Sequence, residues 1–127
     1  EGSGVLRRSR RYLVEGRPVQ TAVSHLPLTV LRVRAQEPSA RRIRAHDTGP
    51  GGIYARLAEL GMAPAHFTEE IRTRMPTPEE NEELELAAGT PVLEVARTAL
   101  TLEHRPVEFN RITMDGSAYV LQYDFEA

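Results

Sequence analysis

Two stretches of this chain, 87 residues apart, carry the same pattern. Residues 2–6 (Gly-Ser-Gly-Val-Leu) match residues 89–93 (Gly-Thr-Pro-Val-Leu), and Arg10 matches Arg97. After a turn that is one residue longer in the second copy, the residues Glu-Gly-Arg-Pro-Val match Glu-His-Arg-Pro-Val. A loop is where such an insertion is tolerated. The repeat therefore predicts two copies of one supersecondary unit that build a shared core.

Each copy has the pattern of a β-hairpin. In the first copy, residues 5–14 and 18–26 are predicted strands around a turn at 15–17. In the second copy, residues 92–101 and 106–114 are predicted strands, with the four intervening residues as the turn. A proline follows each turn, where a strand can begin with a residue that lacks an N–H.

Further elements are predicted between and after the hairpins. Residues 50–61 predict a helix with apolar residues on one face and a glycine stop, and residues 77–89 predict a helix that opens with a capping box. Residues 66–75 are a predicted strand, and residues 118–125 alternate as a half-buried strand does. Residues 28–49 predict a long connection with a short strand at 29–33.

The second copy is thus preceded by a strand and a helix, whereas the chain begins at the first hairpin. We expect an N-terminal strand–helix portion of the first copy to be missing, and a chain that starts with Glu1 to be a fragment. The 127 residues suffice for one domain.

Composition narrows the classes of function. The chain has no cysteine, which excludes disulfides, and it shows neither a secretory leader nor a membrane span, so we expect a cytoplasmic protein. Residues 1–47 hold ten Arg against four acidic residues, and residues 48–127 hold six Arg against fourteen. The basic half could face nucleic acid or an anionic ligand, or its arginines could be solvated and paired with the acidic half.

The sequence disfavours catalysis and metal binding. The four histidines lack metal-ligand spacing, and no motif pairs a nucleophile with a base. We expect no catalytic residue, no metal and no cofactor. The candidates for ligand binding are residues 49–52, where a Gly-rich stretch opens a helix, together with Arg10 as a cation and Glu108 as an acceptor. The alternative interpretation is that these charges form cross-strand ion pairs on a solvated face.

Several ordered motifs resemble one known family, the UTRA effector-binding domain of HutC-type regulators in the GntR family. The residues that carry the resemblance are Gly52-Ile53-Tyr54-Ala55-Arg56-Leu57, Thr68-Glu69-Glu70-Ile71, Met75-Pro76-Thr77-Pro78-Glu79-Glu80, Gly89-Thr90-Pro91-Val92-Leu93, Arg97-Thr98-Ala99 and Arg105-Pro106-Val107-Glu108. The resemblance implies an α+β, chorismate-lyase-like fold: a mainly antiparallel sheet with helices packed on it, in two related halves of which the first is truncated. It implies one effector-binding and dimerisation domain over residues 1–127.

The resemblance also implies partners and a pocket. A small-molecule effector would bind this domain, the protein would be a homodimer and a repressor, and operator DNA would be bound by a separate N-terminal winged helix-turn-helix. The pocket residues implied are Arg10, Tyr12, Gly52, Ile53, Tyr54, Glu108 and Met114.

This chain departs from relatives that bind sugar phosphates. Those relatives commonly carry a second arginine where Tyr12 stands, Ser where Gly52 stands, Glu where Ala22 stands and Tyr where Met114 stands. Because charge-assisted donors are lost and apolar surface is gained, we expect an effector that is less anionic and more apolar than a sugar phosphate. The alternatives are a chorismate-lyase-like enzyme, a dimerisation module without ligand, and direct DNA binding through the basic half.

Overall fold

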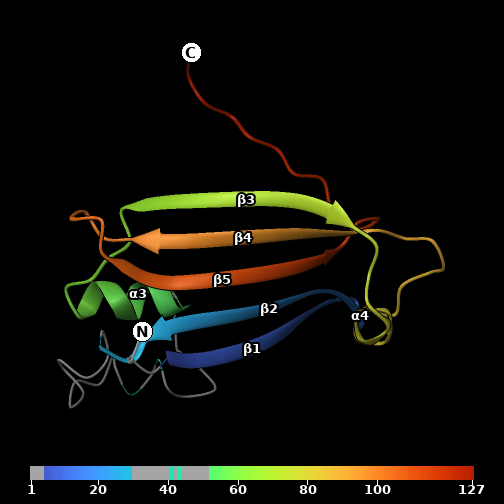
Figure 1. Cartoon of the computed structure of the whole chain (residues 1–127), viewed down its shortest axis with the longest axis horizontal. Helices are drawn as coiled ribbons and strands as arrows, with labels where there is room; N and C mark the ends of the chain where they lie inside the picture. The colour runs from blue at the N-terminus through green and yellow to red at the C-terminus, as the bar shows by residue number, and fades with distance from the viewer. Residues whose placement is uncertain (1–4, 30–40, 42, 44–51) are drawn as a thin grey trace.

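The computed structural model describes residues 5–29, 41, 43 and 52–127. Its elements are, in chain order, β1 Val5–Val14, β2 Arg17–Pro27, α3 Gly52–Glu59, β3 His66–Arg74, α4 Pro78–Leu84, β4 Val92–Leu100 and β5 Pro106–Asp115. The five strands form one sheet in the order β1-β2-β5-β4-β3, and every printed pairing is antiparallel (Figure 1). The predicted α+β class with a mainly antiparallel sheet is confirmed.

The two hairpins lie side by side and are joined through β2 and β5. Val23 pairs with Arg111, which is the residue at the corresponding position of the second copy. In an antiparallel pair, two corresponding residues can face each other only where a twofold axis passes between the strands. The repeat in the sequence is therefore a pseudo-twofold symmetry of the sheet, and its axis passes through this residue pair.

The predicted hairpins are confirmed to within a residue or two at each strand end. The first turn has positive φ at both Glu15 and Gly16, with values of 52° and 79°. This combination is typical of the type I′ turn, whose twist matches the two strands that it joins. In the second turn, His104 adopts a φ of 65° at the position that corresponds to Gly16.

Helix α3 covers one end of one face of the sheet. Its predicted apolar face is confirmed, because Ile53, Leu57 and Leu60 are buried against residues of three strands. Those strand residues include Leu26 of β2 and Val107 of β5, both fully buried. The main hydrophobic core thus lies between α3 and the sheet, and hydrophobic burial holds α3 against β2, β4 and β5.

Helix α4 contacts β2 and begins as predicted. The Thr77 hydroxyl accepts a hydrogen bond from the Glu80 N–H, and the Glu80 carboxylate accepts one from the Thr77 N–H, which completes the capping box. The prediction that this helix continues through Leu86 to Gly89 is wrong. The helix ends at Leu84 because Glu85 adopts a left-handed conformation, with φ of 51°, and its N–H bonds back to the last turn.

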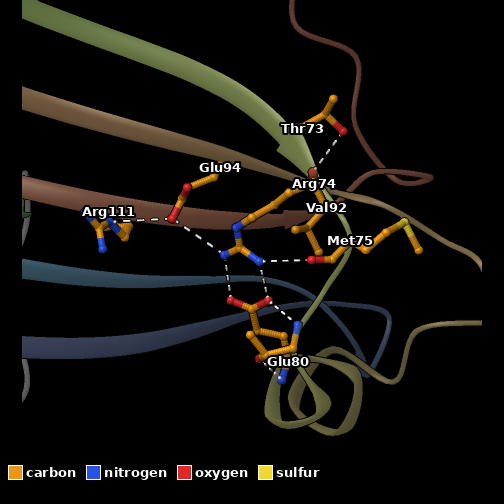
Figure 2. A network of polar contacts seen from close by, with 8 residues as sticks. Thr73, Arg74, Met75, Glu80, Val92, Glu94 and Arg111 are labelled. Atoms are coloured by element: carbon orange, nitrogen blue, oxygen red, sulfur yellow. Dashed lines mark hydrogen bonds and ion pairs between the residues drawn. The ribbon is translucent and has the colours of Figure 1, made fainter.

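An ion-pair network ties α4 to the strands (Figure 2). The Arg74 guanidinium donates two hydrogen bonds of 2.8 Å to the two oxygens of Glu80. Arg74 and Arg111 both approach Glu94, at 3.5 and 3.6 Å. The hydrogen bond from Arg74 is the main reason that the pKa of Glu80 lies below its usual value. Arg74 therefore connects the end of β3, the helix and β4.

The chain after β5 differs from the prediction. Gly116 donates to the Pro91 carbonyl, and a Cβ at this position would lie 2.4 Å from that oxygen, so only glycine fits the turn.

The predicted strand at 118–125 is wrong. Residue 118 lies in a turn, and residues 119–125 pair with no strand of the described residues. Alternation favours a strand, but a strand also needs a neighbour. The other short strand, predicted at 29–33, starts at Thr29, which is helical, and the rest of it lies outside the described residues.

None of the helices within the described ranges is long and apolar enough to span a membrane.

Candidate functional site

A cavity of about 380 Å³ opens on the face of the sheet that carries α3. All the pocket residues expected from the resemblance line it, with the exception of Gly52: they are Arg10, Tyr12, Ile53, Tyr54, Glu108 and Met114. Five further residues complete the lining, namely Gln20, Ala22, Arg97, Asn110 and Ile112. Of these, Ala22 was named from the resemblance only as a position where relatives carry Glu, and the other four were not predicted. The structure thus brings residues of both hairpins and of α3 together, while their role in binding an effector stays a prediction.

The floor of the cavity consists of two cross-strand rows. Ala22 pairs with Ile112, which pairs with Val95, and these buried residues form an apolar strip. In the next row, Asn110 pairs with Arg97, which pairs with Glu69. Because residues directly opposite each other in antiparallel strands share a face, one side of the cavity floor is apolar and the other is polar.

The two arginines of the cavity have different surroundings. The Nε of Arg97 donates a hydrogen bond of 2.6 Å to Glu69 on the neighbouring strand β3. Arg10 lies on the edge strand β1, where its guanidinium stacks 5.7 Å from the ring centroid of Tyr12. The Nε of Arg10 is buried and has no hydrogen-bond partner among the described residues. Arg97 is therefore neutralised within the chain, and Arg10 is the cation left for a ligand.

Strand β5 presents two hydrogen-bond acceptors to the cavity. Glu108 is only 3% exposed and Asn110 only 7%, yet Oε1 of Glu108 and Oδ1 of Asn110 find no donor among the described residues. A buried acceptor without a donor costs about 1–3 kcal/mol, and more when it is charged. These two oxygens would be satisfied by a molecule that brings hydroxyl or ammonium hydrogens into the cavity.

Tyr54 closes the cavity from the first turn of α3. Burial raises the pKa of Tyr54 to about 12, and the negative charge of Glu108 adds to the shift. Its ring contacts the ring of Phe67, with centroids 5.6 Å apart. A hydrogen bond to the Glu108 side chain raises the pKa further, so the protonated phenol of Tyr54 already has an acceptor in the site.

The segment after β5 reaches the rim of the cavity. The Tyr119 hydroxyl donates to Oε1 of Gln20 at 2.9 Å, and Gln20 lines the cavity. Further along, the Tyr123 hydroxyl donates to Glu69, the carboxylate that holds Arg97. This segment thus holds Gln20, which lines the cavity, and Glu69, which binds the lining residue Arg97. The alternating pattern of the segment does not predict this role.

Gly52 was expected to line the pocket, but it is not among the residues that line the cavity. It opens α3 with a φ of 69°, a left-handed value that favours glycine, and a Cβ added there would meet no atom within 4 Å. Its absent side chain therefore serves the backbone conformation at the helix start and does not make room for a neighbour. Residues 49–51, which belong to the same predicted ligand loop, lie outside the described residues.

The repeat itself could have revealed two of the missed residues. Arg97 corresponds to Arg10, and Gln20 corresponds to Glu108. Both members of each pair line the cavity. A cavity that straddles a pseudo-twofold axis receives corresponding residues from both copies, so a candidate in one copy points to its counterpart in the other.

Metal-binding chemistry finds no support in the part of the chain that is described. No group of three or more His, Asp or Glu side chains there is arranged to hold a metal ion.

Comparison with known proteins identifies relatives of the chain. The UTRA domain family matches residues 1–120. An HTH-type transcriptional regulator from Streptomyces coelicolor is 33% identical over 127 residues, which is 99% of this chain but 45% of the relative. The chain thus spans less than half the length of that protein.

Solved structures share the fold. PhnF from Mycobacterium smegmatis superposes with a TM-score of 0.79 at 22% identity, over 97% of this chain and 51% of that one. A GntR-family transcriptional regulator from Enterococcus faecalis gives a TM-score of 0.76 at 20% identity, over 95% and 81%. The C-terminal domain of the histidine utilization repressor from Pseudomonas syringae gives 0.73 at 18% identity, over 97% and 79%.

Proposed function

The chain belongs to the UTRA domain family, and we propose that it is the effector-binding domain of a GntR-family, HutC-type transcriptional repressor. In this proposal a small intracellular metabolite binds the cavity between the two hairpins. Operator DNA is bound by a winged helix-turn-helix elsewhere in the protein, and two copies of the chain form a homodimer. The curated relative, more than half of which lies outside the match, is an HTH-type regulator, which supports this division of labour.

The observation that carries the proposal is the pair of buried acceptors in the cavity. Among the described residues, Glu108 and Asn110 each hold one oxygen without a donor, and Arg10 holds a donor without an acceptor, in the lining of one cavity. Unsatisfied buried polar groups are rare in folded proteins, and their clustering in a cavity is typical of a binding site.

The same residues indicate the chemical class of the effector. Since Glu69 neutralises Arg97, the charges left in the cavity are one guanidinium, at Arg10, and one carboxylate, at Glu108. Ile112 and Met114 add apolar surface between them. A neutral or zwitterionic molecule with an acceptor at one end and hydroxyl or ammonium donors at the other fits this arrangement better than a phosphate dianion does.

Regulation requires that the effector binds one arrangement of the dimer more tightly than the other. The cavity suits such a role because its walls belong to separate elements: Arg10 to an edge strand, Tyr54 to α3 and Glu108 to a central strand. A ligand that joins the three would change how α3 and the hairpins are held together.

Calorimetric titration tests the proposal with three probes: glucose 6-phosphate as a phosphate dianion, glucose as a neutral molecule and phenylalanine as a zwitterion. We expect one of the two probes without phosphate to bind more tightly than glucose 6-phosphate. Arg10→Ala should weaken that binding at least tenfold, and Glu108→Gln should weaken it when the probe brings an ammonium group.

The matched control is Arg11→Ala. Arg11 is the neighbouring residue of β1, and its side chain points to the other face of the sheet, so this variant should bind like the parent chain. Tight binding of glucose 6-phosphate that Arg10→Ala abolishes would overturn the effector class. If a broad metabolite panel never raises the melting temperature, the domain is a dimerisation module without ligand.

A further inference from the structure

A second cavity, of about 450 Å³, lies on the face of the sheet opposite the cavity proposed for the effector. Side chains along a strand alternate between the two faces, so Arg7, Ser9 and Arg11 of β1 point to this second face. Arg10 borders both cavities, but its guanidinium lies against the ring of Tyr12, which lines the effector cavity. We call the second cavity the arginine cavity. It includes arginines of the basic N-terminal half that the proposed function leaves without a role.

Three arginines surround the floor of the arginine cavity. Ser9 pairs with Val23, which pairs with Arg111, so these residues form one cross-strand row. Arg7 and Arg11 each lie two residues from Ser9, about 7 Å along β1, and Arg111 lies two strands away, about 10 Å across the sheet. Because arginine side chains are long and those of the floor are small, the three guanidinium groups can converge above the middle of this row.

The positive charge of this group is only partly compensated. Arg7 and Arg11 are exposed and have neither a hydrogen bond nor an ion pair among the described residues. Arg111 approaches Glu94 at 3.6 Å, and its guanidinium lies 5.8 Å from the ring centroid of Phe109. An anion between the three guanidinium groups would reduce their mutual repulsion and accept charge-assisted hydrogen bonds from them.

Hydroxyl groups complete the polar lining. Thr21 of β2 lies opposite Arg11 on one side and Thr113 of β5 on the other, and all three residues line the arginine cavity together with Ser9. A hydroxyl group can donate one hydrogen bond, and a guanidinium can donate up to five. A tetrahedral oxyanion, which presents several acceptor oxygens in different directions, matches such a set of donors.

Helix α4 limits the length of the anion. It lies beside the turn between β1 and β2, and its residues Glu80 and Glu83 line the arginine cavity (Figure 1). Glu80 is held by Arg74 (Figure 2), whereas Glu83 has no ion-pair partner in the described part of the chain. Four of the seven residues of α4 are glutamates, so a long polyanion that continued past Arg11 would be repelled. The cavity therefore suits a short anion, and Glu83 can accept a hydrogen bond from its uncharged part.

We propose that the arginine cavity binds a small phosphate-bearing molecule. Its phosphate lies between the three guanidinium groups, and a hydroxyl of the rest of the molecule donates to Glu83. The required chemistry is a tetrahedral oxyanion, which both inorganic phosphate and a phosphate ester supply. This inference does not depend on the proposed function, because the guanidinium groups that carry it point away from the effector cavity.

NMR titration with inorganic phosphate and with glycerol 3-phosphate tests the site, because the Nε–H signal of each arginine reports on its own surroundings. We expect the signals of Arg7, Arg11 and Arg111 to shift with either ligand. The signals of Arg10 and Arg97, whose side chains line the effector cavity, should stay in place.

Substitution of the edge-strand arginines tests their contribution. Arg11→Ala should raise the dissociation constant for glycerol 3-phosphate about fivefold, because one of three cationic contacts is lost. The double variant Arg7→Ala/Arg11→Ala should abolish the shift of Arg111. The matched control is Arg72→Ala, which removes an exposed arginine of β3 on the same face but outside the arginine cavity, and which should bind like the parent chain.

Comparison of the two ligands tests the contact with Glu83. Glycerol 3-phosphate should bind more tightly than inorganic phosphate, since only the ester brings hydroxyl groups. Glu83→Ala should remove this preference and strengthen the binding of inorganic phosphate, because a negative charge is lost near the anion. Equal affinities of the parent chain for both ligands would assign the site to free phosphate and refute the hydroxyl contact.

Three results would overturn the inference. An equal loss of binding in Arg11→Ala and Arg72→Ala would mean general attraction by positive charge. Shifts of Arg10 and Arg97 that Arg10→Ala abolishes would place the anion in the effector cavity, and would contradict the proposed effector class as well. A short DNA duplex that binds through Arg7 and Arg11, when neither small ligand moves their signals, would make this face a nucleic-acid surface.

The outcomes also separate this inference from the proposed function. If neither phosphate ligand binds while glucose or phenylalanine does, only the arginine cavity is refuted. If phosphate binds at Arg7 and Arg11 while no metabolite enters the effector cavity, only the proposed effector site is refuted.

Discussion

The two hairpins share one sequence pattern but occupy different positions in the sheet. β4 lies between β3 and β5, whereas β1 pairs with β2 alone within the described residues. As a result Val92 is fully buried, while Val5, at the corresponding position, is 55% exposed. The comparison teaches that the number of neighbouring strands, and not the hairpin pattern, decides whether a side chain belongs to the core.

The arginines of the two hairpins show the same contrast. Arg97 has Glu69 on the adjacent strand, and Arg10 has no strand beyond it in the described part of the chain. Within the described residues, the same position of the repeat therefore has an internal ion pair in the second copy, whereas in the first copy it contributes a guanidinium to the cavity.

The largest expected effect comes from truncating the two corresponding valines. Val92→Ala should lower the free energy of unfolding by about 2 kcal/mol, because it leaves a cavity in a packed region. Val5→Ala should change it by less than about 0.5 kcal/mol. Urea denaturation of both variants measures the difference. Equal losses would mean that the two hairpins are buried to the same extent, against the comparison.

The two corresponding arginines, Arg97 and Arg10, should differ in their contributions to stability and to probe binding. Arg97→Ala should cost about 1.5 kcal/mol of stability, because it leaves the partly buried carboxylate of Glu69 without its cationic partner. Arg10→Ala should leave the unfolding free energy within about 0.5 kcal/mol, while weakening probe binding. Thermal unfolding with and without a bound probe checks both expectations. A large loss of stability in Arg10→Ala alone would assign it a structural role.

The ion pair between Arg74 and Glu80 lies outside the two hairpins, in the segment that precedes the second one. Glu80→Gln should cost about 1 kcal/mol at pH 7, since the bidentate bond to Arg74 loses its charge. The pKa of Glu80 is lowered in the fold, so this stabilisation is present above the unfolded value of about 4.3 and is lost as the pH falls through the folded value. Denaturation curves of the two chains should therefore converge in acid.

The turns give the smallest effect. Gly16→Ala should cost about 0.5 to 1 kcal/mol, because its φ of 79° disfavours a side chain although no atom lies within 4 Å. The second turn already tolerates His104 in the same region, with φ of 65°. His104→Ala is the matched control and should change stability by less than Gly16→Ala does. The reverse order would show that the histidine side chain stabilises its turn.

Local signals predicted most of the elements. The hairpins were predicted to within a residue or two because alternation and turn residues act between neighbours in the sequence. The start of α4 was predicted from its capping box for the same reason. Its end was not predicted, because a glutamate at position 85 gives no sequence signal for the left-handed backbone conformation that it adopts. The strand predicted at 118–125 is wrong because alternation is a local pattern, whereas the neighbouring strand that a β-strand needs is provided by the tertiary structure.

The candidate site was predictable in part. Arg10, Tyr54 and Glu108 were expected through a family resemblance, and the structure brings them to one cavity. Arg97 and Asn110 were missed because their places depend on which strand neighbours which. The sequence shows what side chains a strand carries, but only the order of strands shows which side chains face one another.

By itself, the sequence determined that this chain contains two related hairpins, one amphipathic helix and one capped helix. Those features depend on contacts between residues close in the chain. Only the tertiary structure decided that the hairpins join through β2 and β5 about a twofold axis, so that residues of both copies line one cavity. Strand order depends on burying the apolar faces of all elements together, and that free energy cannot be assigned to any one segment.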